Sequence, residues 1–274
     1  GIVVCFDDGT ITYIDSTFRE YDITPDALPS TTSYFYHCQV NDIFILTNGA
    51  DVPWIITEQS LASGGKLTPM STWPSNYRCS IFEATNGFLV AGRLTIDSRE
   101  HRALVKWAHP LSPGDIDFNW DHLDPTTLAG ENQLSVAGRN MMAMKAQRDH
   151  ILIFFDSAVR RMTHVGGGAI MRFESVLDDD GCVGPHALCD VGGKTVVCGA
   201  GTEALSASFT GQDVAFHRAA VGVGRMEDAC LEDIPSAFPQ LSALRHHNLR
   251  RVAPRGQNPN VLPGGPLRCD FVAD

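Results

Sequence analysis

Three acidic residues in the middle of the chain have the side chains that glycoside hydrolysis requires. Asp121, Asp124 and Glu131 lie close together in a segment rich in Pro and Asp. Glycosidases place two carboxyl groups across the sugar bond. The sequence does not set the distance between these three, and acids in such segments commonly cap turns. We therefore predict turn capping and assign no catalytic residue.

No metal or cofactor site is predicted. The acidic run at 178–180 lacks the alternating ligands and distal Glu of a calcium loop, and the adjacent His246 and His247 point apart in a strand or helix. The glycines at 199–201 do not complete a dinucleotide fingerprint, and no serine lies in a nucleophile elbow. The chain is therefore predicted not to be an enzyme.

Two tryptophans and two arginines are the predicted contacts with a partner. Trp73 and Trp120 lie in loop-like sequence, where a Trp serves as a half-buried clamp or an interface anchor. Trp107 follows an apolar strand and is expected in the core. Arg160, Arg161 and also Lys106 could line a channel or form salt bridges between subunits.

These residues must be positioned by a repeated unit of two apolar strands, a two-residue turn between them and a short link to a third strand. The turns are Asn41-Asp42, Asn86-Gly87, Arg148-Asp149 and Gly192-Gly193, and Asp8-Gly9 opens a partial copy. The predicted units lie near residues 2–14, 34–57, 80–107, 140–164 and 186–206. Antiparallel units at this spacing are typical of propellers and stacked arrays.

The second strands of these units, at 43–46, 88–90, 151–155 and 196–198, are apolar on both faces and must be covered on two sides. A parallel sheet would need crossovers of about a dozen residues, which the short turns exclude. The sequence therefore predicts an all-β fold, a β-propeller-like array of antiparallel meander blades over residues 1–225.

Two segments dense in turn formers, residues 59–76 and 108–131, are predicted as long loops. The repeat fails after about residue 221, and residues 226–274 are predicted to be an irregular C-terminal segment. Five units are few for a closed ring, so the array is expected to be incomplete, truncated or closed by another subunit.

The formal charge of −11 argues against a protein that grips nucleic acid through clustered Lys and Arg. Acidic walls would instead suit a channel through which DNA slides. No apolar run is long enough to span a membrane. The eight cysteines include no Cys-x-x-Cys pair, which indicates buried free thiols and a reducing compartment rather than a zinc site.

Several segments resemble the propeller-type tail proteins of tailed bacteriophages. Residues 34–53, 82–92 and 103–110 carry the similarity, with Lys106-Trp107-Ala108 in place of an Arg/Lys-Trp-Ser-like motif and Asn119-Trp120 in place of a later Asp-Trp motif. The resemblance continues through residues 128–130, 151–155, 158–162 and 182–187 and covers roughly residues 30–225. Residues 201–218 depart from it, because they lack the expected aromatic Asp-Gly pattern.

The resemblance implies a structural virion protein, a DNA-stabilisation-like tail accessory protein that serves as hub, adaptor or nozzle of a short tail. It implies a ring of identical copies, in this family a hexamer, that contacts portal, adaptor and other tail proteins and conducts or retains viral DNA without reading its sequence. Such a protein is assembled in the host cytoplasm and resides in the virion tail. It needs no cofactor.

Two other functions fit the same repeat. A carbohydrate-binding or glycan-hydrolysing β-propeller would use aromatic and acidic side chains on loops at one mouth of the array, with Trp120 among them. A cellular propeller that binds other proteins is the third possibility.

Overall fold

The computed structural model describes residues 1–6, 8–30, 34–112, 114–136, 140–167, 169–191, 194–198, 203–210 and 213–220. Within them the chain forms five antiparallel sheets, one of three strands and four of four strands. In every sheet the strands pair in their order along the chain, so each sheet is a simple meander. The prediction of an all-β chain is confirmed.

The strand bounds follow the repeat. The first sheet comprises β1 (Ile2–Cys5), β2 (Ile11–Ile14) and β3 (Glu20–Asp22). The second comprises β4 (Tyr36–Val40), β5 (Ile43–Thr47), β6 (Trp54–Thr57) and β7 (Thr68–Pro69). The third comprises β8 (Tyr77–Thr85), β9 (Phe88–Ile96), β10 (Arg99–Trp107) and β11 (Gly130–Gln133).

The last two described sheets repeat the same plan. The fourth comprises β12 (Met141–Gln147), β13 (His150–Phe155), β14 (Val159–His164) and β15 (Met171–Leu177). The fifth comprises β16 (Leu188–Val191), β17 (Lys194–Cys198), β18 (Glu203–Thr210) and β19 (Asp213–Ala220).

Each predicted unit therefore gains a strand beyond its expected end. The additions are β3, β7, β11, β15 and β19, the last of which covers residues where the aromatic Asp-Gly pattern is missing. Short edge strands such as Thr68–Pro69 were not predicted because two residues carry no alternation signal, and Pro is tolerated at an edge. The expected long loop at 59–76 is wrong in part, since it also contains most of helix α1 (Glu58–Ala62), capped by the Thr57 hydroxyl.

Turn chemistry sets the register of the hairpins. Asn86 and Gly87 both have positive φ, 50° and 78°, as a two-residue type I′ turn requires. Asp97 and Ser98, at 49° and 66°, make a second such turn between β9 and β10 that the sequence did not reveal. The turn at Gly192-Gly193 lies outside the described residues, although the flanking β16 and β17 pair.

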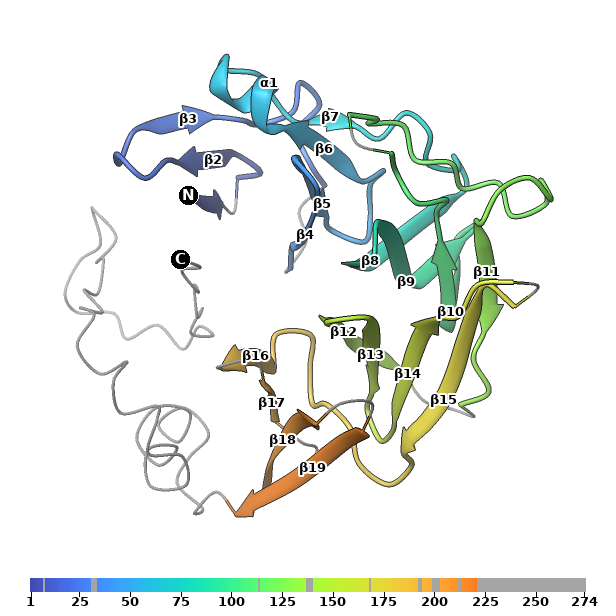
Figure 1. Cartoon of the computed structure of the whole chain (residues 1–274). Coiled ribbons are helices and arrows are strands. Elements are labelled where there is room, and N and C mark those ends of the chain that lie inside the picture. The colour runs from blue at the N-terminus through green and yellow to red at the C-terminus, as the bar shows by residue number, and fades with distance from the viewer. Residues whose placement is uncertain are drawn as a thin grey trace.

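The second, third and fourth sheets are buried on both faces, as their sequences predicted. On β13, Ile151 and Ile153 join the core shared with the β8–β11 sheet, whereas Leu152 and Phe154 join the core shared with the fifth sheet. On β9, alternate residues likewise serve different cores. Figure 1 shows the five sheets following one another along an arc, with β4, β8, β12 and β16 on the inner side and β7, β11, β15 and β19 on the outer side.

Residues 226–274 lie outside the described residues, and so do Gly199-Ala200-Gly201 and His246-His247. In the part of the chain that the structure describes, no helix combines the length and the apolar character needed to cross a membrane.

Candidate functional site: a recess around Lys106

The two tryptophans predicted as partner contacts are buried within this chain. Trp73 is 5% exposed and Trp120 is 4% exposed, so both serve as clamps inside the chain, and contact with a partner stays a prediction. Their rings meet edge to face, with centroids 4.8 Å apart and planes at 81°. The Trp73 indole N–H donates to the carbonyl of Tyr77 at 2.8 Å. Both loops fold back over the sheets because burying an indole removes a large apolar area from water. Trp107 is in the core, as predicted.

The two arginines are engaged within their own sheet. Arg160 on β14 lies 2.7 Å from the carboxylate of Asp178, and Arg161 lies 2.6 Å from that of Glu174 on β15. The Arg161 contact joins residues that are directly opposite in the ladder. These pairs brace the outer strands of the fourth sheet. Contacts with another subunit stay a prediction for both arginines.

The three candidate acids have separate tasks. The Asp124 carboxylate accepts hydrogen bonds from the backbone and hydroxyl of Thr126, and the Asp121 carboxylate accepts one from Leu123 N. Turn capping is confirmed for both. Glu131 instead lies on β11 directly opposite Lys106 on β10. Glu131 is therefore engaged in an ion pair, whereas Asp121 and Asp124 cap turns.

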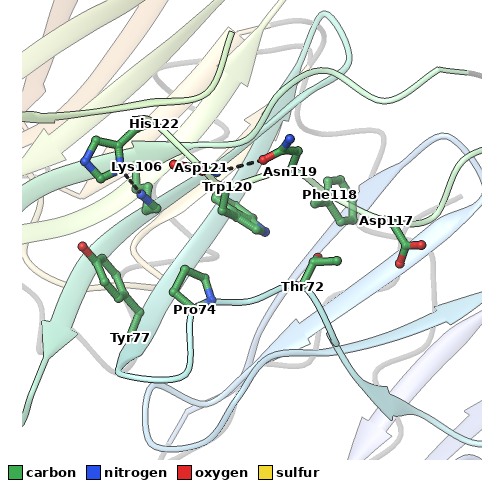
Figure 2. A pocket seen from close by; sticks show the side chains of 10 residues that line it. All are labelled: Thr72, Pro74, Tyr77, Lys106, Asp117, Phe118, Asn119, Trp120, Asp121 and His122. Atoms are coloured by element: carbon green, nitrogen blue, oxygen red, sulfur yellow. Dashed lines mark hydrogen bonds between the residues drawn. The ribbon is translucent and has the colours of Figure 1, made fainter. Parts of the chain in front are cut away.

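A recess of about 550 Å³ opens beside this cross-strand pair. One part of its wall comes from the segment between β7 and β8, and the other comes from the loop that follows β10. Figure 2 shows Lys106 and His122 on one side and Thr72 and Asp117 on the other, with Trp120 between them. The lining residues are Thr72, Pro74, Tyr77, Lys106, Asp117, Phe118, Asn119, Trp120, Asp121 and His122.

Lys106 is the buried charge of the recess, with a side chain 2% exposed. Its ammonium lies 3.2 Å from Glu131 Oε2, donates to His122 Nδ1 at 3.0 Å and lies 5.3 Å from the centroid of the Tyr77 ring. Burial lowers the pKa of Lys106, and the Glu131 carboxylate opposes that shift. Burial also raises the pKa of Tyr77, whose hydroxyl donates to Glu131 at 3.3 Å. Removing one member of this ion pair would leave the other charge buried without compensation, which is costly because the charge has already lost its hydration.

Trp120 places one unsatisfied donor at the recess. Its Nε1–H is buried and has no hydrogen-bond partner among the described residues. In Figure 2 this nitrogen is on the Thr72 side of the ring. A buried N–H without an acceptor costs about 1–3 kcal/mol.

The recess combines donors and acceptors over an apolar wall. Lys106 supplies an ammonium, Asp117 and Asp121 supply carboxylate oxygens, and Pro74 forms part of the wall. Among the described residues no group of His, Cys, Asp or Glu side chains could hold a metal ion. The arrangement is suited to binding a polar molecule through hydrogen bonds.

The sequence interpretation missed Lys106 and Glu131 as a pair. A signal was present, because Lys106 is the one charge in the apolar run at 103–107, and a charge inside a buried strand needs a partner. The partner itself could only be found from the register, since Glu131 lies across a long loop.

Comparison with protein-family models and with curated proteins gives no match. Among solved structures, the extracellular domain of BT4673 from B. thetaiotaomicron aligns at 11% identity and a TM-score of 0.43, over 79% of this chain and 27% of that one. Apo AztD from Citrobacter koseri aligns at 10% identity and a TM-score of 0.44, over 79% of this chain and 61% of AztD. At these TM-scores the similarities establish neither fold family nor function.

Proposed function

We propose that the chain is a non-enzymatic structural protein of a short bacteriophage tail, a hub, adaptor or nozzle whose copies form a ring that extends the portal channel. The observation that carries the proposal is the succession of antiparallel meanders buried on both faces. The segments that resemble phage tail proteins, residues 34–53, 82–92 and 103–110, fall largely on consecutive strands of these meanders.

The proposed architecture is a propeller-like array, incomplete within this chain. Three features support it: the pairing of strands in chain order, the shared cores between successive sheets and the inner-to-outer order of the strands in Figure 1. Radial repetition of this kind leaves short edges that copies of a protein can use for assembly.

The proposed partners are other copies of the chain in a hexameric ring, the portal and adaptor proteins and other tail components. Viral DNA would pass along the ring without sequence-specific contacts, which the charge of −11 favours because it disfavours adhesion of a polyanion. The proposed location is the virion tail, after assembly in the host cytoplasm.

A carbohydrate-binding protein is the second candidate, and the recess around Lys106 favours it. Its lining combines aromatic rings with carboxylates and other polar side chains, which can form hydrogen bonds with a polar ligand. Glycan hydrolysis has less support, because Asp121 and Asp124 cap turns and Glu131 pairs with Lys106. A cellular protein-binding role has no specific observation in its favour.

Mass spectrometry of purified virus particles tests the leading proposal. We expect this chain in the particles at a fixed ratio to the portal protein, and native mass spectrometry of the full chain with portal and adaptor should give a hexamer. Absence of the chain from intact particles, or a monomer that persists beside both partners, would contradict the proposal.

A further inference from the structure

We propose that residues 114–128, in the loop between β10 and β11, dock residues 244–255 of a second copy of this chain. The inference rests on the self-association that the proposed ring requires, and it names the two surfaces that meet. A ring needs two different, complementary patches on each copy, because a head-to-tail contact can close a ring whereas a self-complementary patch gives a dimer.

The loop exposes apolar side chains on an ordered backbone. Ile116 is 46% exposed, Leu123 is 80% exposed and Leu128 is 36% exposed. The backbone N–H of Leu123 donates to Asp121 Oδ1 and that of Leu128 donates to His109 Nδ1, both at 2.9 Å. Hydrogen bonds thus hold both leucines in place while their side chains stay in water. Exposed apolar groups held in this way are typical of a surface that meets another protein.

The same stretch concentrates negative charge. Its Lys, Arg, Asp and Glu residues are all acids: Asp115, Asp117, Asp121 and Asp124. They supply −4 of the chain's formal net charge of −11. The nearby Lys106 ammonium already pairs with Glu131 at 3.2 Å and does not offset this charge. The surface therefore fits a partner that is both apolar and basic.

Residues 244–255 have that chemistry. The stretch contains no acid, and its basic and large apolar residues are Leu244, Arg245, Leu249, Arg250, Arg251, Val252 and Arg255. Arginine suits this surface because its guanidinium can donate two parallel hydrogen bonds to one carboxylate. The recess of about 550 Å³ lined by Asp117 and Asp121 has room for an arginine side chain. The segment lies outside the described residues, and its amino-acid composition is what makes it the occupant.

Photocrosslinking of the full chain identifies the occupant. A chain with Leu123→benzoylphenylalanine is mixed at high salt with an isotope-labelled preparation of the unchanged chain and returned to low salt. Leu28→benzoylphenylalanine is the matched control, because Leu28 is 64% exposed and lies in the segment between β3 and β4. We expect crosslinks from position 123 to residues 244–255 of the labelled copy, and none to that segment from position 28. Crosslinks confined to one copy, or directed to other residues, would overturn the inference.

Charge exchange measures how much the contact contributes. Asp115→Lys combined with Asp117→Lys should weaken self-association about tenfold, and so should Arg250→Glu combined with Arg251→Glu. The chain that carries all four changes should recover most of the loss, because the charges are complementary again. Analytical ultracentrifugation measures the association, and thermal unfolding of each variant checks the fold.

Glu20→Lys combined with Asp26→Lys is the matched control, since both acids are exposed and the net charge changes by the same amount. Equal weakening in this control, no recovery in the fourfold variant, or a wild-type chain that does not self-associate would overturn the inference. Particles that contain the chain as a hexamer whose assembly tolerates Asp115→Lys with Asp117→Lys would leave the tail proposal standing without this surface. Crosslinks between copies of a chain that is absent from particles would do the reverse.

Discussion

The two faces of the β8–β11 sheet are covered in different ways. On one face, side chains from β4–β6 meet it together with Trp73, Phe118 and Trp120 from the loops, which we call the loop-filled interface. On the other face, strands β12–β15 supply most of the contacts through apolar residues such as Met144, Ile153 and others, which we call the strand-filled interface. The loop-filled interface adjoins the buried charge of Lys106 and the recess.

The difference shows how a repeated scaffold acquires a specific site. Strand residues such as Ile153 are held by ladders on both sides, so their positions follow from the repeat. Loop residues such as Phe118 are held mainly by packing and a few hydrogen bonds, for example that from His109 N to Asn119 O. A loop can therefore introduce polar groups beside a core without disturbing the sheets, as loops on rigid scaffolds commonly do.

The largest expected effect is a cavity in the strand-filled interface. Phe155 is fully buried on β13, and its carbonyl accepts from Cys182 N at 2.8 Å, which holds the backbone in place. Phe155→Ala should therefore lower the free energy of unfolding by about 4–5 kcal/mol, because the site cannot collapse. Phe118→Ala removes an equally buried ring from a loop that can close over the space, and should cost about 3 kcal/mol.

Urea unfolding followed by circular dichroism measures both losses. A Phe118→Ala variant that is as unstable as Phe155→Ala, or more so, would show that the loop is as rigid as the ladders. The proposed distinction between the two interfaces would then be wrong.

The second effect concerns the ion pair beside the loop-filled interface. Glu131→Gln leaves the Lys106 ammonium buried beside a neutral amide and should cost about 2–3 kcal/mol. Lys106→Met removes the buried charge itself, and Glu131, with a side chain 27% exposed, can still be hydrated. This variant should cost less, about 1–2 kcal/mol.

The order of these two variants decides the interpretation, and chemical denaturation at pH 7 measures it. If Lys106→Met were the more damaging, the contacts of the ammonium with Glu131, His122 and Tyr77 would outweigh the cost of burying it, because Met keeps most of the aliphatic stem.

The strand faces were predictable, whereas the site was not. The unbroken apolar runs at residues 43–46 and 151–155 required cover on both faces, and the cores confirm it. Sequence left open whether Trp73 and Trp120 are clamps or interface anchors, because the path of a loop depends on contacts between distant segments, here an edge-to-face contact across 47 positions of sequence. The Pro or Asp next to each Trp indicated that the Trp lies near a turn, but it did not indicate which way the indole faces.

Arg160 and Lys106 show the same limit for charges. Each stands out in the sequence, yet the partners Asp178 and Glu131 are set by strand pairing and by β11 and β15, which the sequence did not reveal as strands. The sequence thus shows that each of these residues carries a positive charge, but it does not show which carboxylate pairs with it.

The smallest expected effect is a pH dependence that belongs to the loop-filled interface. Cys38 and Cys79 lie in its core, 6% and 0% exposed, and the described strand-filled core contains no thiol. Burial raises the pKa of both thiols. The folded chain therefore keeps these protons while the unfolded chain releases them, so the stabilisation is complete below the unfolded thiol pKa and is lost as the pH rises above it.

Unfolding free energies measured between pH 7.5 and 9.5 should fall by an amount of order 1 kcal/mol for each thiol. Cys79→Ala should start from a lower stability at pH 7.5, because it leaves a small cavity, but its stability should fall less steeply with pH. Parallel slopes in the two proteins would mean that Cys79 keeps its proton in the unfolded chain as well or is ionised when folded. Thiol labelling of the folded chain separates these cases, since a buried protonated thiol reacts slowly.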